Sequence, residues 1–152
     1  MDDPSIRSAT SADAQDVTRL LIELKCAVDE PDVRRRLEGL QDSPSDRVFL
    51  AEVAGTPVAL LGIHVAPLLH RDALARITAL IVTKDLRGQG IGTRLLETAE
   101  RWAVEQGCTQ IELNSGDHHE PAHTFYRHRG YHLDDRRFLK EDDVLLRADD
   151  ER

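Results

Sequence analysis

A run of closely spaced glycines is the part of this chain whose residue types and spacing point most directly to chemistry. The run comprises Arg87, Gly88, Gln89, Gly90, Ile91 and Gly92. It follows the apolar, β-branched segment 77–83 and leads into segment 91–103, where apolar residues recur at helical spacing. Backbone N–H groups at a helix start lack intrahelical partners and attract phosphate, and glycine lets the backbone approach such a group closely. This strand, turn and helix are therefore predicted to cradle a diphosphate.

The glycine spacing excludes two common phosphate-binding motifs. A dinucleotide fingerprint requires G-x-G-x-x-G and an acidic residue about 20 positions later, and the glycines here are spaced differently. A P-loop ends in Gly-Lys-Ser/Thr, whereas this chain continues with Gly92, Thr93 and Arg94. The segment does match R-x-x-G-x-G, formed by Arg87, Gly90 and Gly92. A plain strand-to-helix turn is the alternative interpretation.

This motif resembles the acetyl-CoA-binding motif of the GNAT superfamily of N-acetyltransferases. Family members also carry an N-x-x-A element, then an F-Y pair, then G-F or G-Y, and this chain matches most of that pattern. The matching residues are Ala122, Phe125, Tyr126, Gly130 and Tyr131. The family asparagine falls on His119, which is a departure. The resemblance is strong over residues 76–140 and weaker upstream.

The resemblance implies an α/β fold (an α+β mixed sheet), with a central, mostly antiparallel sheet flanked by about four helices. In that GNAT-like fold the cradle strand and the next strand splay apart, and the pantetheine arm of acetyl-CoA pairs with the exposed strand edge. The cofactor-binding residues that the family pattern implies are Leu80, Ile81, Val82, Arg87, Gly88, Gln89, Gly90, Ile91, Gly92, Thr93, Asn114 and His119.

The implied reaction moves an acetyl group from acetyl-CoA directly to a primary amine. It requires the reactants side by side, a neutral amine, and a proton for the leaving thiolate. Tyr126 stands where the family carries its catalytic tyrosine, and a phenol is a suitable proton donor. The alternative role of Tyr126 is packing beside Phe125. Asn114 ends a strand beside the cofactor and would either bond a pantetheine amide or terminate the strand.

The general base is not identified by the sequence. Many family members carry a glutamate on the cradle strand, at a position that is Thr78 here, and threonine cannot act as a base. Glu112, His64, His70 or a chain of water molecules are the substitutes. The sequence does not choose among them.

A competing motif is the H-E-x-x-H formed by residues 119–123. On a helix this spacing places two histidines on one face for zinc, which would make the protein a metallohydrolase. Pro121 opposes that interpretation because proline suits the first turn of a helix, which puts His119 at or before the cap. A third zinc ligand is also needed, and the position six residues beyond His123 is Arg129. No metal is expected.

The composition and charge of the chain narrow its expected cellular location and its expected binding partners. The 152 residues carry a formal net charge of −8, which argues against nucleic acid as a partner and is compatible with a cationic substrate. No apolar run is long enough for a membrane span. The start, residues 1–4, lacks the features of a signal peptide, so a cytoplasmic location is expected. Cys26 and Cys108 are expected to be reduced and to act as small buried hydrophobes.

The elements that position the motif are expected in the order β-α-α-β-β-β-α-β-α-β. Strands are predicted over 6–9, 47–53, 58–66, 74–83, 108–114 and within 131–140. Helices are predicted from a cap at Ser11 through Leu24 to Val28, then over 32–40, from 91 to a stop at Gly107, and over 120–129. One GNAT-like domain is predicted over 1–140, followed by an acidic tail, 141–152.

These observations predict an acyltransferase that uses acetyl-CoA and acetylates a small-molecule or peptide amine. The identity of the acceptor is not encoded in any motif, and a homodimer is compatible with the sequence. A non-catalytic acyl-CoA sensor is the alternative, because the strand glutamate is missing.

Overall fold

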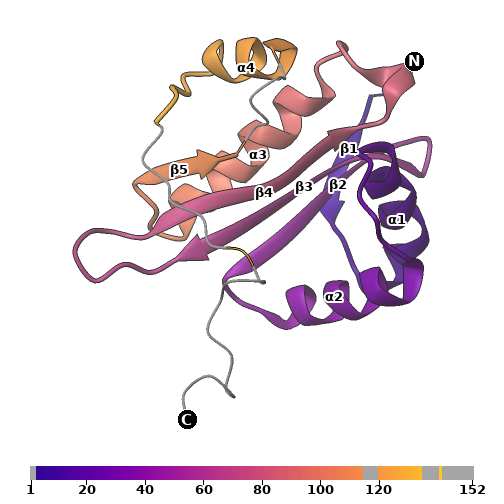
Figure 1. Ribbon diagram of the computed structural model, residues 1–152, viewed down its shortest axis with the longest axis horizontal. Helices are drawn as coiled ribbons and strands as arrows, with labels where there is room; N and C mark the ends of the chain where they lie inside the picture. Colours follow the sequence, from indigo (N-terminus) through magenta and orange to yellow (C-terminus); the bar gives the residue numbers. More distant parts are fainter. Residues whose placement is uncertain (1–2, 115–119, 135–140, 142–152) are drawn as a thin grey trace. The chain divides into compact units, whose positions relative to one another are not determined.

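The computed structural model describes residues 3–114, 120–134 and 141. The chain divides into two compact units, residues 1–114 and 115–152, and each is considered by itself. The described residues of the first unit form one five-stranded sheet in the order β1-β2-β3-β4-β5 (Figure 1). The strands are β1 (Ser5–Ser8), β2 (Asp46–Val53), β3 (Thr56–Ala66), β4 (Leu74–Val82) and β5 (Gln110–Leu113). Neighbours are antiparallel except β4 and β5, which are parallel, and this confirms the mixed, mostly antiparallel sheet.

A two-residue turn joins β2 to β3. Ala54 and Gly55 have φ angles of 51° and 81°, the left-handed conformation that suits the twist of a tight hairpin. Strand β3 then runs through the centre of the sheet, and its residues from Pro57 to Ile63 are all buried. Because both faces of β3 are covered, its sequence is continuously apolar rather than alternating.

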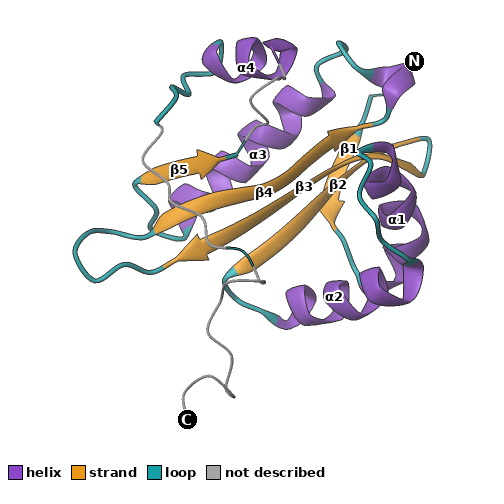
Figure 2. Ribbon diagram, viewed as in Figure 1, coloured by secondary structure: helices purple, strands orange, loops and turns teal. Residues whose placement is uncertain are grey.

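Helices cover the two faces of the sheet (Figure 2). Helices α1 (Ala14–Glu23) and α2 (Glu30–Asp42) lie on one face, and α3 (Ile91–Glu105) lies on the other. The core under α1 and α2 includes Leu20, Val33, Leu37, Leu50, Leu60 and Ile81. The short 3-10 helices η1 (Ser11–Asp13) and η2 (Lys84–Leu86) precede α1 and the glycine turn, respectively.

The predicted start and end of the first helix are wrong. Thr10, not Ser11, caps η1, because the Asp13 carboxylate turns back to accept from the Thr10 N–H at 2.8 Å. Helix α1 ends at Glu23, so Leu24 and Val28 follow the helix, and Leu24 is exposed. The second helix is longer than predicted because Asp29 caps it by accepting from Asp32 N–H.

The described part of the second unit contains α4 (Glu120–Arg127), two residues shorter than the predicted 120–129. Gly130 follows with φ 90°, which is the left-handed conformation expected just beyond a helix. Residues 131–134, the described part of the range 131–140 in which a strand is predicted, form no strand. The remaining predictions for 135–140 and for the tail fall outside the described residues, apart from Glu141.

None of the helices in the described ranges is long and apolar enough to cross a membrane.

Candidate active site

The glycine turn lies exposed between β4 and α3. Gly88 and Gly90 have φ angles of 80° and 85°, and a Cβ at either position would meet no atom within 4 Å. Both glycines therefore serve backbone conformation, and the space beside them is open. The Arg87 side chain folds back, and its Nε donates to the Val82 carbonyl at 2.9 Å. The turn is thus tied to the end of the strand that precedes it.

The start of α3 offers backbone amides without a competing side chain. Its N-cap is Gly90, and its first turn contains no acidic residue. The first helical bond runs from Arg94 N–H to the Gly90 carbonyl at 3.1 Å, so the amides of Ile91 and Gly92 precede it. Ile91 is buried and holds this end of the helix against the core. A helix start of this kind is suited to bind an anion.

Strand β4 is paired on both sides along only part of its length. Strand β5 pairs with Leu74 to Ile77 and ends at Leu113. From Ala79 to Val82, β4 pairs only with β3 among the described strands. Asn114 follows the last paired residue of β5, where the two strands separate. This separation, which we call the fork, leaves one backbone edge of β4 without a strand partner among the described residues; we call it the open edge.

The register assigns backbone groups to the open edge. Thr83 N–H donates to the Val58 carbonyl of β3 at 2.8 Å. Because successive residues of a strand direct their N–H and C=O groups to opposite sides, Ile81 also directs its backbone groups toward β3, where Leu60 is its register partner. Leu80 and Val82 direct theirs to the open edge. Ile81, which the family pattern grouped with these two, instead contributes a buried side chain.

Glu23 supports the glycine turn, and the sequence prediction missed it. From the end of α1 its carboxylate accepts from Thr83 Oγ1 at 2.8 Å and from Lys84 N–H at 3.0 Å. The Thr83 hydrogen bond is the main reason that the pKa of Glu23 is lowered, and the Lys84 bond adds to it. No sequence signal links these positions, because they are about 60 residues apart and meet only through packing of α1 on the sheet.

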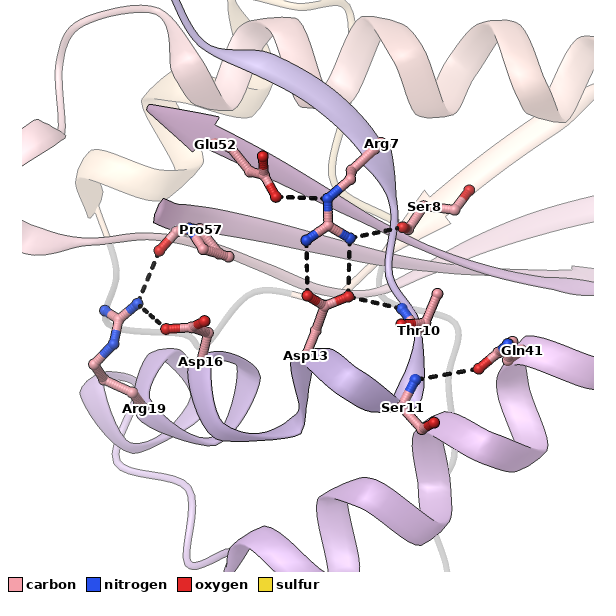
Figure 3. Close-up of polar contacts among 10 residues, drawn as sticks. All are labelled: Arg7, Ser8, Thr10, Ser11, Asp13, Asp16, Arg19, Gln41, Glu52 and Pro57. Atoms are coloured by element: carbon pink, nitrogen blue, oxygen red, sulfur yellow. Dashed lines mark hydrogen bonds and ion pairs between the residues drawn. The ribbon is translucent and has the colours of Figure 1, made fainter. Parts of the chain in front are cut away.

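The opposite end of α1 is fixed by an ion-pair network. Figure 3 shows the Arg7 guanidinium between the carboxylates of Asp13 and Glu52, with contacts of 2.7 and 2.5 Å. The Arg7 hydrogen bond lowers the pKa of Asp13, and the two carboxylates raise the pKa of Arg7. Helix α1 is thus anchored to β1 and β2 at its start and to the glycine turn at its end.

Beyond the apolar core, four neighbouring strands carry a row of charged or polar residues. The register pairs Asp46 with His64, His64 with Arg76, and Arg76 with Glu112. His64 Nδ1 lies 2.9 Å from Asp46 Oδ1, and Arg76 forms an ion pair with Glu112. We call these four residues the polar row. It crosses the sheet next to the fork, one register position before the last β4-β5 pair.

Thr78, the residue at the family's glutamate position, forms a bulge in β4. The register steps from Ile77 opposite Ile63 to Ala79 opposite Gly62, which leaves Thr78 as the extra residue. Its Oγ1 lies 2.7 Å from the point where a Cβ on Gly62 would stand. A side chain at position 62 would therefore force the Thr78 hydroxyl to move.

Comparisons with known proteins identify the family of this chain. The model of the acetyltransferase (GNAT) family matches residues 14–131. The chain belongs to this family. It is 32% identical over 137 residues to aminoalkylphosphonate N-acetyltransferase of Salmonella typhimurium, with 89% of each chain covered. The chain is therefore an acyltransferase related to N-acetyltransferases.

Solved structures of GNAT enzymes share the fold. Glucosamine-6-phosphate N-acetyltransferase from Arabidopsis thaliana aligns with a TM-score of 0.81 at 19% identity, covering 93% of this chain and 100% of that one. An aminoglycoside N-acetyltransferase in complex with CoA aligns with a TM-score of 0.84 at 12% identity, covering 93% and 96%. At these identities the likeness establishes the fold alone.

The tyrosine expected to act as the acid lies in the second unit. Tyr126, in α4, is half-buried and contacts Phe125 and Tyr131 edge-to-face, with ring centroids 5.4 and 6.1 Å away. Burial raises the pKa of Tyr126, so its phenol stays protonated at neutral pH. The predicted packing against Phe125 is thus present, and the role of Tyr126 as proton donor stays a prediction.

The H-E-x-x-H motif is only partly described. Helix α4 begins at Glu120 with Pro121 in its first turn, as the proline predicted. His119 lies outside the described residues, both as a zinc candidate and as a predicted cofactor contact. In the parts of the chain that are described, no group of three or more metal-ligating side chains occurs. Cys26 and Cys108 are free thiols; Cys108 is buried, which raises its pKa, whereas Cys26 is half-exposed.

Proposed function

We propose that this protein transfers an acetyl group from acetyl-CoA to the primary amine of a small molecule. The observation that carries the proposal is the continuity of the glycine turn with the open edge of β4. The amides at the start of α3 would hold the diphosphate of CoA. The pantetheine arm would then add to the sheet beside Leu80 and Val82, as an extra strand would, with Asn114 at the fork.

In this proposal Tyr126 is the general acid. Collapse of the tetrahedral adduct breaks the carbon–sulfur bond and leaves the electron pair on sulfur. The phenol donates its proton to that thiolate and regains one from solvent. The family position of Tyr126 supports this role.

The acceptor class is inferred from relatives. The Salmonella relative is named for aminoalkylphosphonates, and two enzymes of the same fold are named for glucosamine 6-phosphate and for aminoglycosides. All of these acceptors are small molecules with a primary amine. The net charge of −8 favours a cationic acceptor, whereas the phosphonate relative favours an anionic one, so both belong in the test. A cytoplasmic location stays a prediction.

The test is turnover of acetyl-CoA with a mixture of 2-aminoethylphosphonate, glucosamine 6-phosphate and an aminoglycoside, measured as released CoA thiol. We expect thiol release that depends on the amines, with Tyr126→Phe lowering kcat by about 100-fold while the Kd for acetyl-CoA stays unchanged. Calorimetry provides the Kd. If wild-type protein released no thiol above hydrolysis, the small-amine proposal would be wrong. If Tyr126→Phe kept full kcat, Tyr126 would be a packing residue only.

A further inference from the structure

The polar row carries an inference that rests on the proposed function. An aliphatic amine is mostly protonated at neutral pH and cannot attack a thioester until it loses that proton. The family's usual strand glutamate is replaced by Thr78, so this chain requires another proton acceptor. We infer that His64, oriented by Asp46, is the general base of this enzyme.

The orientation of the imidazole is set by a carboxylate. His64 Nδ1 lies 2.9 Å from Asp46 Oδ1, and the other carboxylate oxygen of Asp46 accepts from Ser43 Oγ at 2.7 Å. A carboxylate can only accept, so the proton of the neutral imidazole lies on Nδ1. The lone pair is then on Nε2, which has no hydrogen-bond partner in the described part of the chain. A base held by a second group is an arrangement that activates proton transfer.

The sheet face that α1 and α2 cover is apolar and buried under these helices and becomes polar and exposed at the polar row. Leu50, Leu60 and Ile81 are buried beneath α1 and α2. His64 is four residues beyond Leu60 on the same face of β3, and its side chain is 43% exposed, compared with 18% for Asp46. The sheet face is therefore accessible to solvent at His64, and an amine can reach it there.

The same row lies close to the fork. Strands are about 4.8 Å apart and two residues along a strand span about 6.6 Å. Thr78 lies on the strand next to His64, two residues beyond Arg76, the register partner of His64. The intervening position on that face is Gly62, which has no side chain to obstruct it. A thioester lying along the open edge of β4 would end at this point. His64 Nε2 is therefore within reach of the amine, directly or through one water.

The other candidate bases are less suited. Glu112 Oε1 is already engaged, because it accepts from the Arg76 guanidinium. His70 lies exposed in the loop between β3 and β4, and no hydrogen bond within the described residues orients it. The charged groups that face His64 are Asp46 on β2 and Arg76 on β4, with Glu112 on β5 next to Arg76.

The proton and electron balance is complete. His64 Nε2 takes one proton from the ammonium group, leaving a neutral amine. The nitrogen lone pair forms the carbon–nitrogen bond at the thioester carbonyl, and the carbon–sulfur bond breaks with its electron pair on sulfur. The thiolate takes a proton from Tyr126, and the second proton lost by nitrogen restores Tyr126 through solvent. The proton on His64 then passes to solvent.

The experiment measures thiol release with the same three amines for wild type, His64→Gln and Asp46→Asn. We expect kcat to fall about 100-fold in His64→Gln and about tenfold in Asp46→Asn, because asparagine donates to Nδ1 and moves the proton onto Nε2. After correction for protonation of the amine, wild-type kcat/KM falls on acidification, and this fall disappears in His64→Gln. His132→Gln is the matched control and keeps the wild-type profile.

Three outcomes decide the inference. A His64→Gln enzyme with wild-type kcat and pH profile overturns it while the acetyltransferase proposal stands. If His70→Gln loses activity while His64→Gln keeps it, the inference is also overturned, and His70 is the general base instead. Calorimetry with acetyl-CoA must give a wild-type Kd for His64→Gln; a lost Kd would make His64 structural. If wild type releases no thiol, the proposed function fails first.

Discussion

Helices α2 and α3 differ in how the backbone amides of their first turns are capped. Each leaves backbone amides without intrahelical partners. In α2 the chain itself supplies the cap, since Asp29 caps the helix and Glu30 and Asp32 lie in its first turn. In α3 the cap is Gly90, with no acidic residue in the first turn. In the proposed function, an external anion would take at α3 the place that the Asp29 carboxylate takes at α2.

The largest effect is expected from giving α3 the type of cap that α2 has. Gly90→Asp would place a carboxylate where the diphosphate of CoA is proposed to bind. We expect the Kd for acetyl-CoA to rise at least about 100-fold, through repulsion of the diphosphate and competition for the amides. Calorimetry measures this Kd.

Gly55→Asp is the matched control for Gly90→Asp. Gly55 has φ 81°, and a Cβ at this position, as at Gly90, would meet no atom within 4 Å, but Gly55 lies in the β2-β3 hairpin. Both variants carry the same strain and the same added charge, so only Gly90→Asp is expected to lose affinity. Equal Kd values for the two variants would contradict the assigned site.

A smaller effect is expected from Glu23, which holds the start of the glycine turn. Glu23→Gln weakens the hydrogen bonds to Thr83 and Lys84. We expect the Kd for acetyl-CoA to rise about threefold to tenfold, and the free energy of unfolding to fall by roughly 1 kcal/mol after allowing for solvent screening. Glu38→Gln, an exposed change on α2, is the control.

The pH dependence of that stability effect has a definite sign. The pKa of folded Glu23 is lowered from an ordinary value of 4.5. Its contribution is therefore fully present above that value and is lost as the pH falls through the lower folded pKa. Urea unfolding of wild type and Glu23→Gln should differ at neutral pH and converge in acid. A difference that grew on acidification would contradict the assigned hydrogen bonds.

The smallest effect on function is expected at α2. Asp29→Ala removes the cap that accepts from Asp32 N–H, and we expect a loss of about 1 kcal/mol in the free energy of unfolding. The Kd for acetyl-CoA should not change, because this helix start is not part of the proposed site. Asp29→Ser, which restores a capping oxygen, should recover most of the stability. A higher Kd for acetyl-CoA in Asp29→Ala would contradict the difference proposed between the two helix starts.

The sequence predicted those features that are set by interactions between residues close together in the chain. The glycine turn and the end of α3 at Gly107 depend on neighbouring residues, so local patterns identify them. The open edge of β4 is not visible in this way, because Leu80 and Val82 are ordinary strand residues and their role depends on where β5 ends.

The partners of Glu23 and His64 were also beyond the sequence. Glu23 meets Thr83 only after α1 packs on the sheet, and His64 meets Asp46 only through the register of β2 with β3. The choice between Thr10 and Ser11 as the cap depends on Asp13, which is drawn to Arg7 of β1. Each depends on contacts between residues that are distant in the chain, which periodicity does not report.

Backbone amide hydrogen exchange, measured by NMR with and without acetyl-CoA, tests the central claim most directly. Binding along the open edge of β4 should slow exchange at Leu80 and Val82 and at Ile91 and Gly92. Exchange at Ile81 should stay unchanged, because its amide already points toward β3. Saturating acetyl-CoA that left Leu80, Val82 and the start of α3 unprotected would contradict the account.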